Sequence, residues 1–326
     1  MASGLTSSLC QLYPGAKIDW LIEDTNADLL RANPGINKIY LWPRRNWRSL
    51  RQEWRLRQLF GEFFRFAGDL RAERYDLILD LQGLLKSGLW AVLAGGRRRI
   101  GLGSREGSGL LMTEVLDRHI DSPLIGKEYR KLAEYLGALS DSFQLDIAVS
   151  DPDRATAAEL LIKAPVVEPF VVLAPFTTRP QKHWFDERWA ELTTRLRANA
   201  CSAVILGGGG DREKAEIIAA MAGNDLVNFA GMTSLGQCAA IIERAALVIG
   251  VDTGLTHLGI ALNIPTLALF GSTRPYLDTG RSNSRVLFEP LECSPCRRRP
   301  TCGGTFDCMR RHSVDSVFQE AMAILP

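Results

Sequence analysis

A strand, a tight turn and a helix in the second half of the chain carry the residue types that can hold a diphosphate. The segment ALVIGVDTGLTHL places Asp252, Thr253 and Gly254 between the apolar strand and the helix that contains His257. Free backbone N–H groups at the start of such a helix attract anions, and a glycine lets the anion come close to the backbone. Asp252 can also accept hydrogen bonds from ligand hydroxyls. The simpler alternative makes Asp252 a helix cap and His257 an ordinary helical residue.

The loop LAPFTTRPQKHW offers two hydroxyls and a cation directly after another apolar strand. Thr177, Thr178 and Lys182 follow a strand that ends near Ala174. A lysine placed here would neutralise the negative charge that grows on a phosphate as its bond to a sugar breaks. The alternative is a solvated surface loop.

A run of four glycines ends the next strand. Gly207 to Gly210 leave room for a ligand close to the backbone, and Asp211, which follows them, could meet ribose hydroxyls. The run lacks the G-x-G-x-x-G spacing of dinucleotide-binding loops, so it is a weak signal when taken alone.

An arginine-rich and aromatic segment lies in the first half, from Trp42 to Arg74. It contains nine arginines and four acidic residues, with three interleaved tryptophans. Arginine suits bidentate contact with carboxylates and phosphates, and tryptophan suits surfaces that are partly apolar and partly wet. An anionic lipid-linked saccharide and a membrane surface would fit this segment, whereas no signature of a nucleic-acid-binding fold is present. The alternative is a solvated amphipathic helix whose tryptophans face the core. The candidate acceptor contacts are Arg44, Arg48, Arg51 and Lys86.

Four cysteines crowd into a short segment near the C-terminus. Cys293 and Cys296 form a C-x-x-C pair, but Cys302 and Cys308 do not form a second one. The spacing allows a structural zinc site with four thiolates, and free thiols or a disulfide are the alternatives. We expect no catalytic role for the cluster.

The elements that must position these residues alternate between strands and helices. KIDWLI, NKIYLW, YDLILDL and RRRIGL predict strands in the first half, and PFVVLAPF, CSAVILGG, DLVNFAG, ALVIGVD and IPTLALFG predict strands in the second. The near-continuous apolar character of the second set is typical of a parallel sheet covered on both faces. We therefore expect an α/β protein with two Rossmann-like domains, residues 1–152 and 153–326, whose parallel sheets face a central cleft.

Composition agrees with a packed enzyme of ordinary size. The 326 residues are 46% hydrophobic and 23% charged, with a formal net charge of +2. These values disfavour an extended disordered chain and give no overall sign of a nucleic-acid binder. The most apolar long stretch, residues 77–94, contains Asp80, Gln82 and Lys86, so no spanning segment is predicted. The start lacks the features of a secretory signal, and we expect a cytoplasmic protein.

The beginning of the first half departs from the pattern. Residues 2–12 predict a helix with no strand before it, although doubly wound domains open with a strand that lies centrally in the sheet. Omitting that strand would leave its neighbours with unpaired backbone groups. Either the first strand is missing or the domain opens with a helix.

The motifs TTRPQKHW and VDTGLTHL resemble those of the bacterial heptosyltransferases of lipopolysaccharide core assembly, glycosyltransferase family 9, and most of all heptosyltransferase I. Weaker similarity extends along nearly the whole chain. The resemblance implies a GT-B fold, an ADP-heptose donor, and inverting transfer without a required cofactor or metal. It also implies a lipid-anchored Kdo acceptor, which is presented at the cytoplasmic face of the inner membrane, so that the enzyme would be peripheral there.

Carried over residue by residue, the resemblance implies contacts with the donor phosphates from Thr177, Thr178 and Lys182. Asp252, Thr253, Gly254 and His257 would hold the diphosphate and the sugar, with Lys182 and Asp252 as the catalytic candidates. Asp211 falls at an acidic ribose contact of the family, and Met232 at a methionine that lines the adenine pocket.

One departure from the family pattern concerns the general base. The family opens with an apolar strand and a Gly-Asp loop whose aspartate is the expected base, and this sequence contains neither. The hypothesis is that Met1 is an internal methionine and that roughly fifteen upstream residues are absent, by comparison with the first unit of such a sheet. Otherwise the chain should bind donor better than it turns donor over, because base catalysis contributes about 10² to 10⁴ in rate.

The sequence thus predicts heptose transfer from ADP-heptose to the Kdo region of lipid A. Three alternatives remain open: a relative that acts on another heptose or sugar acceptor, a donor-binding protein without turnover, and a metal-sensing or structural module built on the cysteine cluster.

Overall fold

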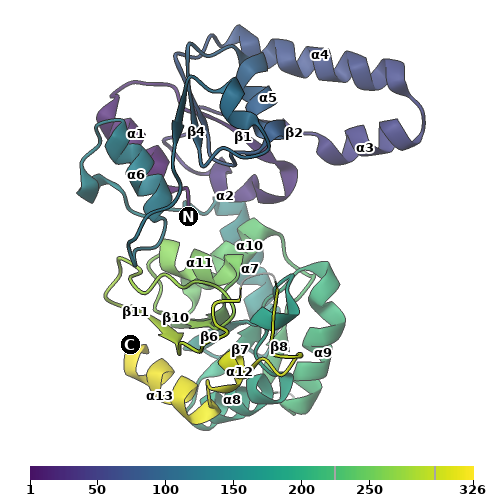
Figure 1. Ribbon diagram of the computed structural model, residues 1–326. Coiled ribbons are helices and arrows are strands. Elements are labelled where there is room, and N and C mark those ends of the chain that lie inside the picture. Colours follow the sequence, from purple (N-terminus) through teal and green to yellow (C-terminus); the bar gives the residue numbers. More distant parts are fainter. Residues whose placement is uncertain (224, 297–298) are drawn as a thin grey trace.

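The computed structural model of the chain describes residues 1–223, 225–296 and 299–326 (Figure 1). Parallel strands form three sheets, two in the first half and one in the second. Helices flank each of them, and the two halves lie one above the other in Figure 1. The structure thereby confirms the predicted α/β class with parallel sheets.

The first half contains a two-stranded and a three-stranded sheet. Strand β1 (Asp19–Glu23) pairs with β2 (Lys38–Trp42), and β3 (Leu77–Asp80) pairs with β4 (Arg98–Leu102), which pairs with β5 (Glu114–Leu116). The two sheets are separate, and no strand of the described residues pairs β1 or β2 with β3, β4 or β5. The helices of this half are α1 (Gly4–Leu12), α2 (Asp28–Arg31), α3 (Arg44–Gln52), α4 (Leu56–Ala72), α5 (Leu85–Ala94) and α6 (Lys127–Tyr135).

The second half is built on one six-stranded parallel sheet. Its strand order is β11-β10-β9-β6-β7-β8, which places β6 and β9 at the centre. The strands are β6 (Phe170–Ala174), β7 (Ser202–Ile205), β8 (Leu226–Asn228), β9 (Leu247–Val251), β10 (Thr266–Phe270) and β11 (Ser284–Phe288). The helices are α7 (Asp151–Lys163), α8 (Asp186–Ala198), α9 (Arg212–Met221), α10 (Leu235–Arg244), α11 (Gly254–Ala261), α12 (Asp307–Arg310) and α13 (Val314–Ile324).

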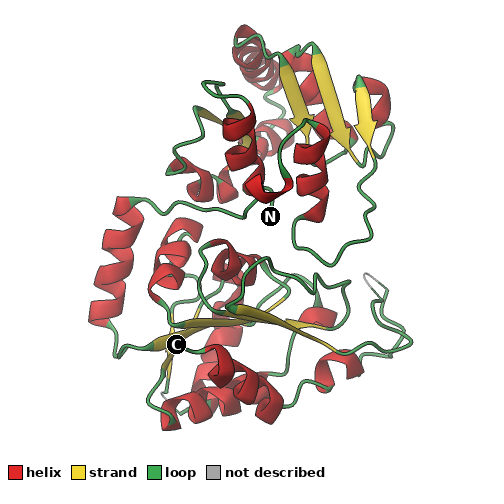
Figure 2. Ribbon diagram, turned by 90° about the vertical axis from the view of Figure 1, so that its left-hand side faces the viewer, coloured by secondary structure: helices red, strands yellow, loops and turns green. Residues whose placement is uncertain are grey.

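Helices cover both faces of this sheet, as Figure 2 shows. Val171 and Leu173 of β6 point into one buried cluster, and Phe170 and Val172 point into the other. Side chains of a strand alternate between the two faces, so burial on both sides requires the unbroken apolar runs seen in the sequence. Each fully buried aliphatic side chain stabilises the fold by about 1.5–3 kcal/mol, which makes the central strands a firm base for the loops that follow them.

A third buried cluster joins the two halves. Leu5, Ile100 and Leu132 of the first half share it with Ile260 and Phe270 of the second. The predicted boundary between residues 152 and 153 falls inside α7, which packs against α10. That boundary stays a proposal.

The strands predicted from apolar runs are present within a few residues of their expected positions, as is the N-terminal helix. The sequence did not reveal β5, which has three residues, or β11, which is an edge strand with partly exposed side chains. Within the described residues, no helix combines the length and the apolarity needed to cross a bilayer.

Candidate active site

Three loops meet at the carboxyl edge of the six-stranded sheet. Ala174 at the end of β6 lies opposite Gly250 of β9, and Leu173 lies opposite Ile205 of β7. The segments that follow these three neighbouring strands therefore emerge side by side, which is where ligands bind in sheets of this kind. They are the three loops that the sequence singled out.

A pocket of about 670 Å³ lies at this edge. Its size is in the range typical of small-molecule sites. Met1 is the lining residue from the first half, and the others come from the three loops and the helix α11: Phe176, Thr177, Thr178, Lys182, Asp211, Asp252, Thr253, Gly254 and His257. The structure thus brings all the predicted donor contacts together except Met232.

The Asp252 carboxylate is the centre of the polar contacts in this pocket. Its Oδ2 lies 2.6 Å from Lys182 Nζ and accepts a hydrogen bond of 2.7 Å from the Thr273 hydroxyl. Its Oδ1 lies 3.3 Å from His257 Nε2. Burial favours a higher pKa for Asp252, but the bonds from His257, Lys182 and Thr273 outweigh burial and hold the pKa well below its usual range. Asp252 is therefore ionised and is poorly suited to accept a proton.

His257 is held from its other side by Tyr276. The Tyr276 hydroxyl lies 2.9 Å from His257 Nδ1. Burial, followed by the charge of Asp252, raises the pKa of Tyr276, so the phenol keeps its proton. A phenol that donates to Nδ1 leaves Nε2–H to donate to Asp252, which orients the imidazole at the pocket wall.

The helix α11 presents its N-terminus to the pocket. Thr253 is in the extended conformation and Gly254 begins the helix, with open space where a side chain at Gly254 would lie. The first N–H groups of a helix have no partner within it, so they remain available to an anion. The Thr256 hydroxyl bonds the carbonyl of Val251 at 2.7 Å and fixes the turn from strand to helix. A side chain at Gly250 would overlap Thr256, so this close turn depends on that glycine.

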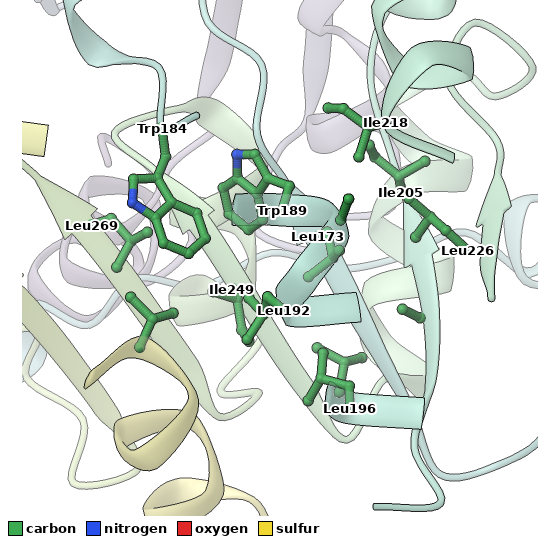
Figure 3. Packing of buried hydrophobic residues seen from close by; sticks show 14 of the residues in the cluster. Leu173, Trp184, Trp189, Leu192, Leu196, Ile205, Ile218, Leu226, Ile249 and Leu269 are labelled. Atoms are coloured by element: carbon green, nitrogen blue, oxygen red, sulfur yellow. The ribbon is translucent and has the colours of Figure 1, made fainter. Parts of the chain in front are cut away.

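The loop that carries Lys182 is anchored in the core. Trp184, two residues further on, is buried, and its Nε1–H donates to the carbonyl of His312 at 2.9 Å. Its ring packs edge to face on Trp189 at 4.9 Å, and Figure 3 shows the two indoles side by side above the aliphatic cluster. His183 Nε2 lies 2.8 Å from the carbonyl of Thr177, which ties the two ends of the loop together. The position of Lys182 therefore depends on packed residues beneath it.

Asp211 has a structural contact as well as a place in the pocket. Its Oδ2 accepts a hydrogen bond of 2.8 Å from the N–H of Gly208, within the glycine turn. Gly207 has no room for a side chain because Phe176 lies against it. Met232 is about half exposed and does not line the pocket. The ribose contact of Asp211 and the adenine contact of Met232 stay predictions.

The acceptor candidates lie on the first half, outside the pocket lining. Arg44 forms an ion pair of 2.8 Å with Glu23, and Lys86 lies over the ring of Trp42 at 5.3 Å. Arg48 and Arg51 are exposed on α3 and have no ion pair with any residue that the structure describes. All four remain acceptor candidates, in a place separate from the donor pocket.

The structure does not assemble the four-thiolate site that the cysteine spacing allowed. Among the described residues, no group of three or more histidine, cysteine, aspartate or glutamate side chains is arranged to hold a metal ion. The four thiols lie near enough to interact electrostatically, and two of them have other contacts: Cys296 Sγ lies 3.9 Å from the carbonyl of Ser272, and buried Cys308 packs beneath Gly271. Backbone N–H groups of Phe306 and Gly304 lower the pKa of Cys302. All seven cysteines are free thiols.

Sequence reasoning missed three contributors to this site. Phe176 follows β6, and Thr273 and Tyr276 follow β10, the strand beside β9. Their signal was the position of GSTRPY after an apolar strand, but only the strand order shows that this loop reaches Asp252.

The sequence profile of glycosyltransferase family 9 (heptosyltransferase) matches residues 63–305. Lipopolysaccharide heptosyltransferase 1 of Pseudomonas aeruginosa is 31% identical over 296 residues, which are 89% of this chain and 79% of that protein. Lipopolysaccharide heptosyltransferase 2 of Escherichia coli K12 is 28% identical over 84% of this chain and 80% of its own length.

Solved structures show the same fold. Escherichia coli ADP-heptose lipopolysaccharide heptosyltransferase II superposes with a TM-score of 0.77 at 23% identity, over 99% of this chain and 94% of that one. The Escherichia coli heptosyltransferase WaaC with ADP gives a TM-score of 0.75 at 23% identity, over 99% and 95%. The architecture is therefore the GT-B fold that the sequence predicted. By the extent of the family match and by its 31% identity to a curated member, this chain belongs to glycosyltransferase family 9 and is a glycosyltransferase.

Proposed function

We propose that this chain transfers heptose from ADP-heptose to the Kdo region of lipid A in the synthesis of the lipopolysaccharide inner core. The observation that carries the proposal is the pairing of Lys182 with Asp252 beside the open N-terminus of α11. A cation and a helix terminus in one pocket suit a diphosphate leaving group. The relatives named above support heptose as the sugar and lipopolysaccharide as the product.

In this proposal the donor diphosphate lies over Thr253 and Gly254, where it accepts hydrogen bonds from the first N–H groups of α11. Lys182 turns from Asp252 toward a phosphate oxygen as negative charge grows on ADP. The positive charge that the reaction needs at the leaving group thus comes from the protein, and this is why we propose a metal-independent mechanism. A single displacement at the anomeric carbon inverts its configuration.

Asp252 serves in this mechanism as a positioning residue. Its low pKa makes it a weak base, so we assign it the task of holding Lys182 and His257 at the pocket wall. Asp211 is the other carboxylate among the described lining residues, and it is bonded within its own turn. We therefore assign neither carboxylate the role of general base.

The acceptor side of the proposal rests on the first half. Arg44, Arg48, Arg51 and Lys86 would contact the carboxylates and phosphates of a lipid-linked saccharide. Such an acceptor would place the enzyme at the cytoplasmic face of the inner membrane. A relative with another acceptor is the second candidate, because heptosyltransferases 2 and 3 also match this chain over 84% and 88% of its length.

The test measures donor binding and transfer separately. Calorimetry should show that ADP-heptose binds, and that Lys182→Met weakens binding by about tenfold or more, the loss expected for a charge-assisted contact. Lys163→Met is the matched control, because Lys163 is an exposed lysine on α7 whose ion pair is with Glu159. Equal binding by both variants would contradict the assignment of Lys182.

Transfer to Kdo₂-lipid A is then compared with transfer to the same acceptor already carrying one heptose. A preference for the unmodified acceptor supports the inner-core reaction. A preference for the heptosylated acceptor would assign the chain to the second candidate. Tight donor binding without transfer to either acceptor would leave the donor-binding protein as the remaining interpretation.

A further inference from the structure

The α3–α4 hairpin carries apolar side chains on its solvent side that no other part of the fold covers. Trp54, in the connection between the two helices, is 82% exposed. Phe60 and Phe64 on α4 are 57% and 68% exposed. In Figure 1 this hairpin extends beyond the rest of the first half, with its connection at the far end. A group of exposed aromatic residues of this kind is typical of an interaction surface.

The exposed apolar residues of α4, Leu56, Phe60 and Phe64, form a stripe on the side of the helix that faces away from the core. Leu56, Phe60 and Phe64 follow one another at intervals of four residues and so share one side of the helix. The core-facing side carries Ala67 and Leu70, which pack with Trp90 and Tyr40 in the fourth buried cluster. The fold already secures α4 through that cluster. On the outer side Phe64 meets Phe63 edge to face at 5.6 Å, whereas Phe60 has no ring contact with a described residue, so packing accounts for little of this aromatic surface.

Trp54 is also unexplained by local geometry. Its φ of +57° lies in the left-handed region, where glycine or asparagine is the ordinary choice and a bulky side chain is strained. A glycine here would relieve that strain without removing any packed side chain. A tryptophan at an exposed and strained turn indicates a role outside the folded monomer.

The charges around the stripe specify the partner. Residues 44–65 contain seven arginines and two glutamates. Glu53 is paired with Arg55, and Glu62 accepts hydrogen bonds from Asn46 and Trp47 on the side facing α3. The arginines without an ion pair to any described residue are Arg45, Arg48, Arg51, Arg57 and Arg65. An apolar aromatic stripe bordered by cations fits a bilayer surface with anionic headgroups.

We propose that the α3–α4 hairpin docks this protein on anionic phospholipid, with Trp54, Phe60 and Phe64 entering the headgroup region. Arg57, three residues after Trp54, contacts the headgroup phosphates. Docking on a membrane would bring the protein to a lipid-linked acceptor, so this proposal rests on the proposed function. Vesicle binding can nevertheless be measured without heptose transfer, so a failure of the docking proposal can be distinguished from a failure of the proposed function.

The experiment is co-flotation of the full chain with vesicles of phosphatidylcholine, with and without phosphatidylglycerol, first without any Kdo glycolipid and then with the Kdo glycolipid added. Binding should require the anionic lipid and weaken as salt is raised. Trp54→Gly and Phe60→Ser should each lower partitioning about tenfold, as expected when a large apolar side chain no longer enters the interface. Arg57→Gln should lower partitioning about fivefold, the loss of one cation near an anionic surface.

Ile162→Ser is the matched control, because Ile162 is 80% exposed on α7 in the second half. It should bind like the unmodified chain. Thermal unfolding checks that the variants fold, and Trp54→Gly should melt at the same temperature or higher because it relieves a strained φ. A loss of vesicle binding with retained stability is the result that a merely structural role for Trp54 would not give.

Three results would overturn the proposal. The first is equal vesicle binding by Trp54→Gly, Phe60→Ser and the unmodified chain. The second is binding only when the vesicles contain the Kdo glycolipid, which would mean capture through the acceptor site. The third is a dimer in light scattering that Phe60→Ser abolishes, which would assign the stripe to a second copy of the chain. Vesicle binding without heptose transfer would leave the docking intact and count against the proposed function alone.

Discussion

Both oxygens of the Asp252 carboxylate already have partners inside the protein. Lys182 and Thr273 bond Oδ2, and His257 lies against Oδ1. The side chains of Lys182 and Asp252 are only 15% and 17% exposed, so each charge depends on the other for compensation. The sequence alone allowed Asp252 to be a free acceptor for ligand hydroxyls, whereas the structure makes it the residue that keeps a cation in place beside the helix terminus.

Asp252→Asn should destabilise the protein in a pH-dependent way. The pKa of Asp252 is lower in the folded chain than the ordinary value of about 3.9. Its ionisation therefore stabilises the fold above about pH 4, and this contribution is lost as the pH falls toward the folded-state pKa. We expect a loss of roughly 1–3 kcal/mol at pH 7 that shrinks below pH 4. Urea unfolding at several pH values measures this loss. A difference that stays constant with pH would contradict the assigned ion pair.

Tyr276→Phe should weaken donor binding while leaving the pocket folded. The substitution removes the hydroxyl that lies 2.9 Å from His257 Nδ1 and frees the imidazole to rotate. One lost hydrogen bond corresponds to about 2- to 12-fold in the dissociation constant for ADP-heptose. Calorimetry on Tyr276→Phe, on His257→Ala and on the double variant Tyr276→Phe, His257→Ala measures the coupling. Additive losses in the double variant would show that Tyr276 does not act through His257.

At the scale of elements, the strands β6, β7 and β9 decide where the chemistry occurs. These strands could be predicted from their apolar runs, because a strand buried on both faces needs such a run. The contact of Thr273 with Asp252 and that of Tyr276 with His257 could not be predicted. They arise because β10 lies beside β9, and no local sequence pattern gives this strand order. Likewise the sequence could not tell which tryptophans face the core: Trp47 packs on Trp90, and Trp54 is exposed.

The anchoring of the Lys182 loop gives a prediction for Trp184. Trp184→Ala removes a buried indole that packs edge to face on Trp189 and should cost about 3–5 kcal/mol of unfolding free energy. Trp184→Phe keeps most of the packing but loses the bond to the His312 carbonyl, so it should cost less. Urea unfolding measures both losses. Phe318→Leu is the control, because Phe318 packs against the same cluster farther along the chain. If Trp184→Phe weakens ADP-heptose binding and Phe318→Leu does not, the buried indole positions Lys182.

At the scale of the whole molecule, a shared core links the donor half to the other half. Leu5 and Leu132 lie in one buried cluster with Ile260 of α11 and Phe270 of β10. The N–H of Ile125 donates to the carbonyl of Asp278 at 2.8 Å, and Arg281 bonds the carbonyl of Leu145 at 2.9 Å. The helix whose N-terminus faces the pocket is thus packed, at its other end, against the first half. Donor binding at the pocket should therefore also stabilise the first half.

We accordingly expect ADP to stabilise both halves together. At a hundred times its dissociation constant, a ligand that binds only the folded state contributes about 2.7 kcal/mol. Because the halves share buried apolar side chains, calorimetry should show one transition that moves as a whole, and hydrogen exchange should slow in α6 as well as in β9. Leu5→Ala should weaken this coupling, since it opens a cavity in the shared cluster at a cost of about 2–5 kcal/mol. Two transitions in the unmodified chain, of which ADP shifts only one, would show that the halves are thermodynamically separate and that α11 senses the donor without the first half.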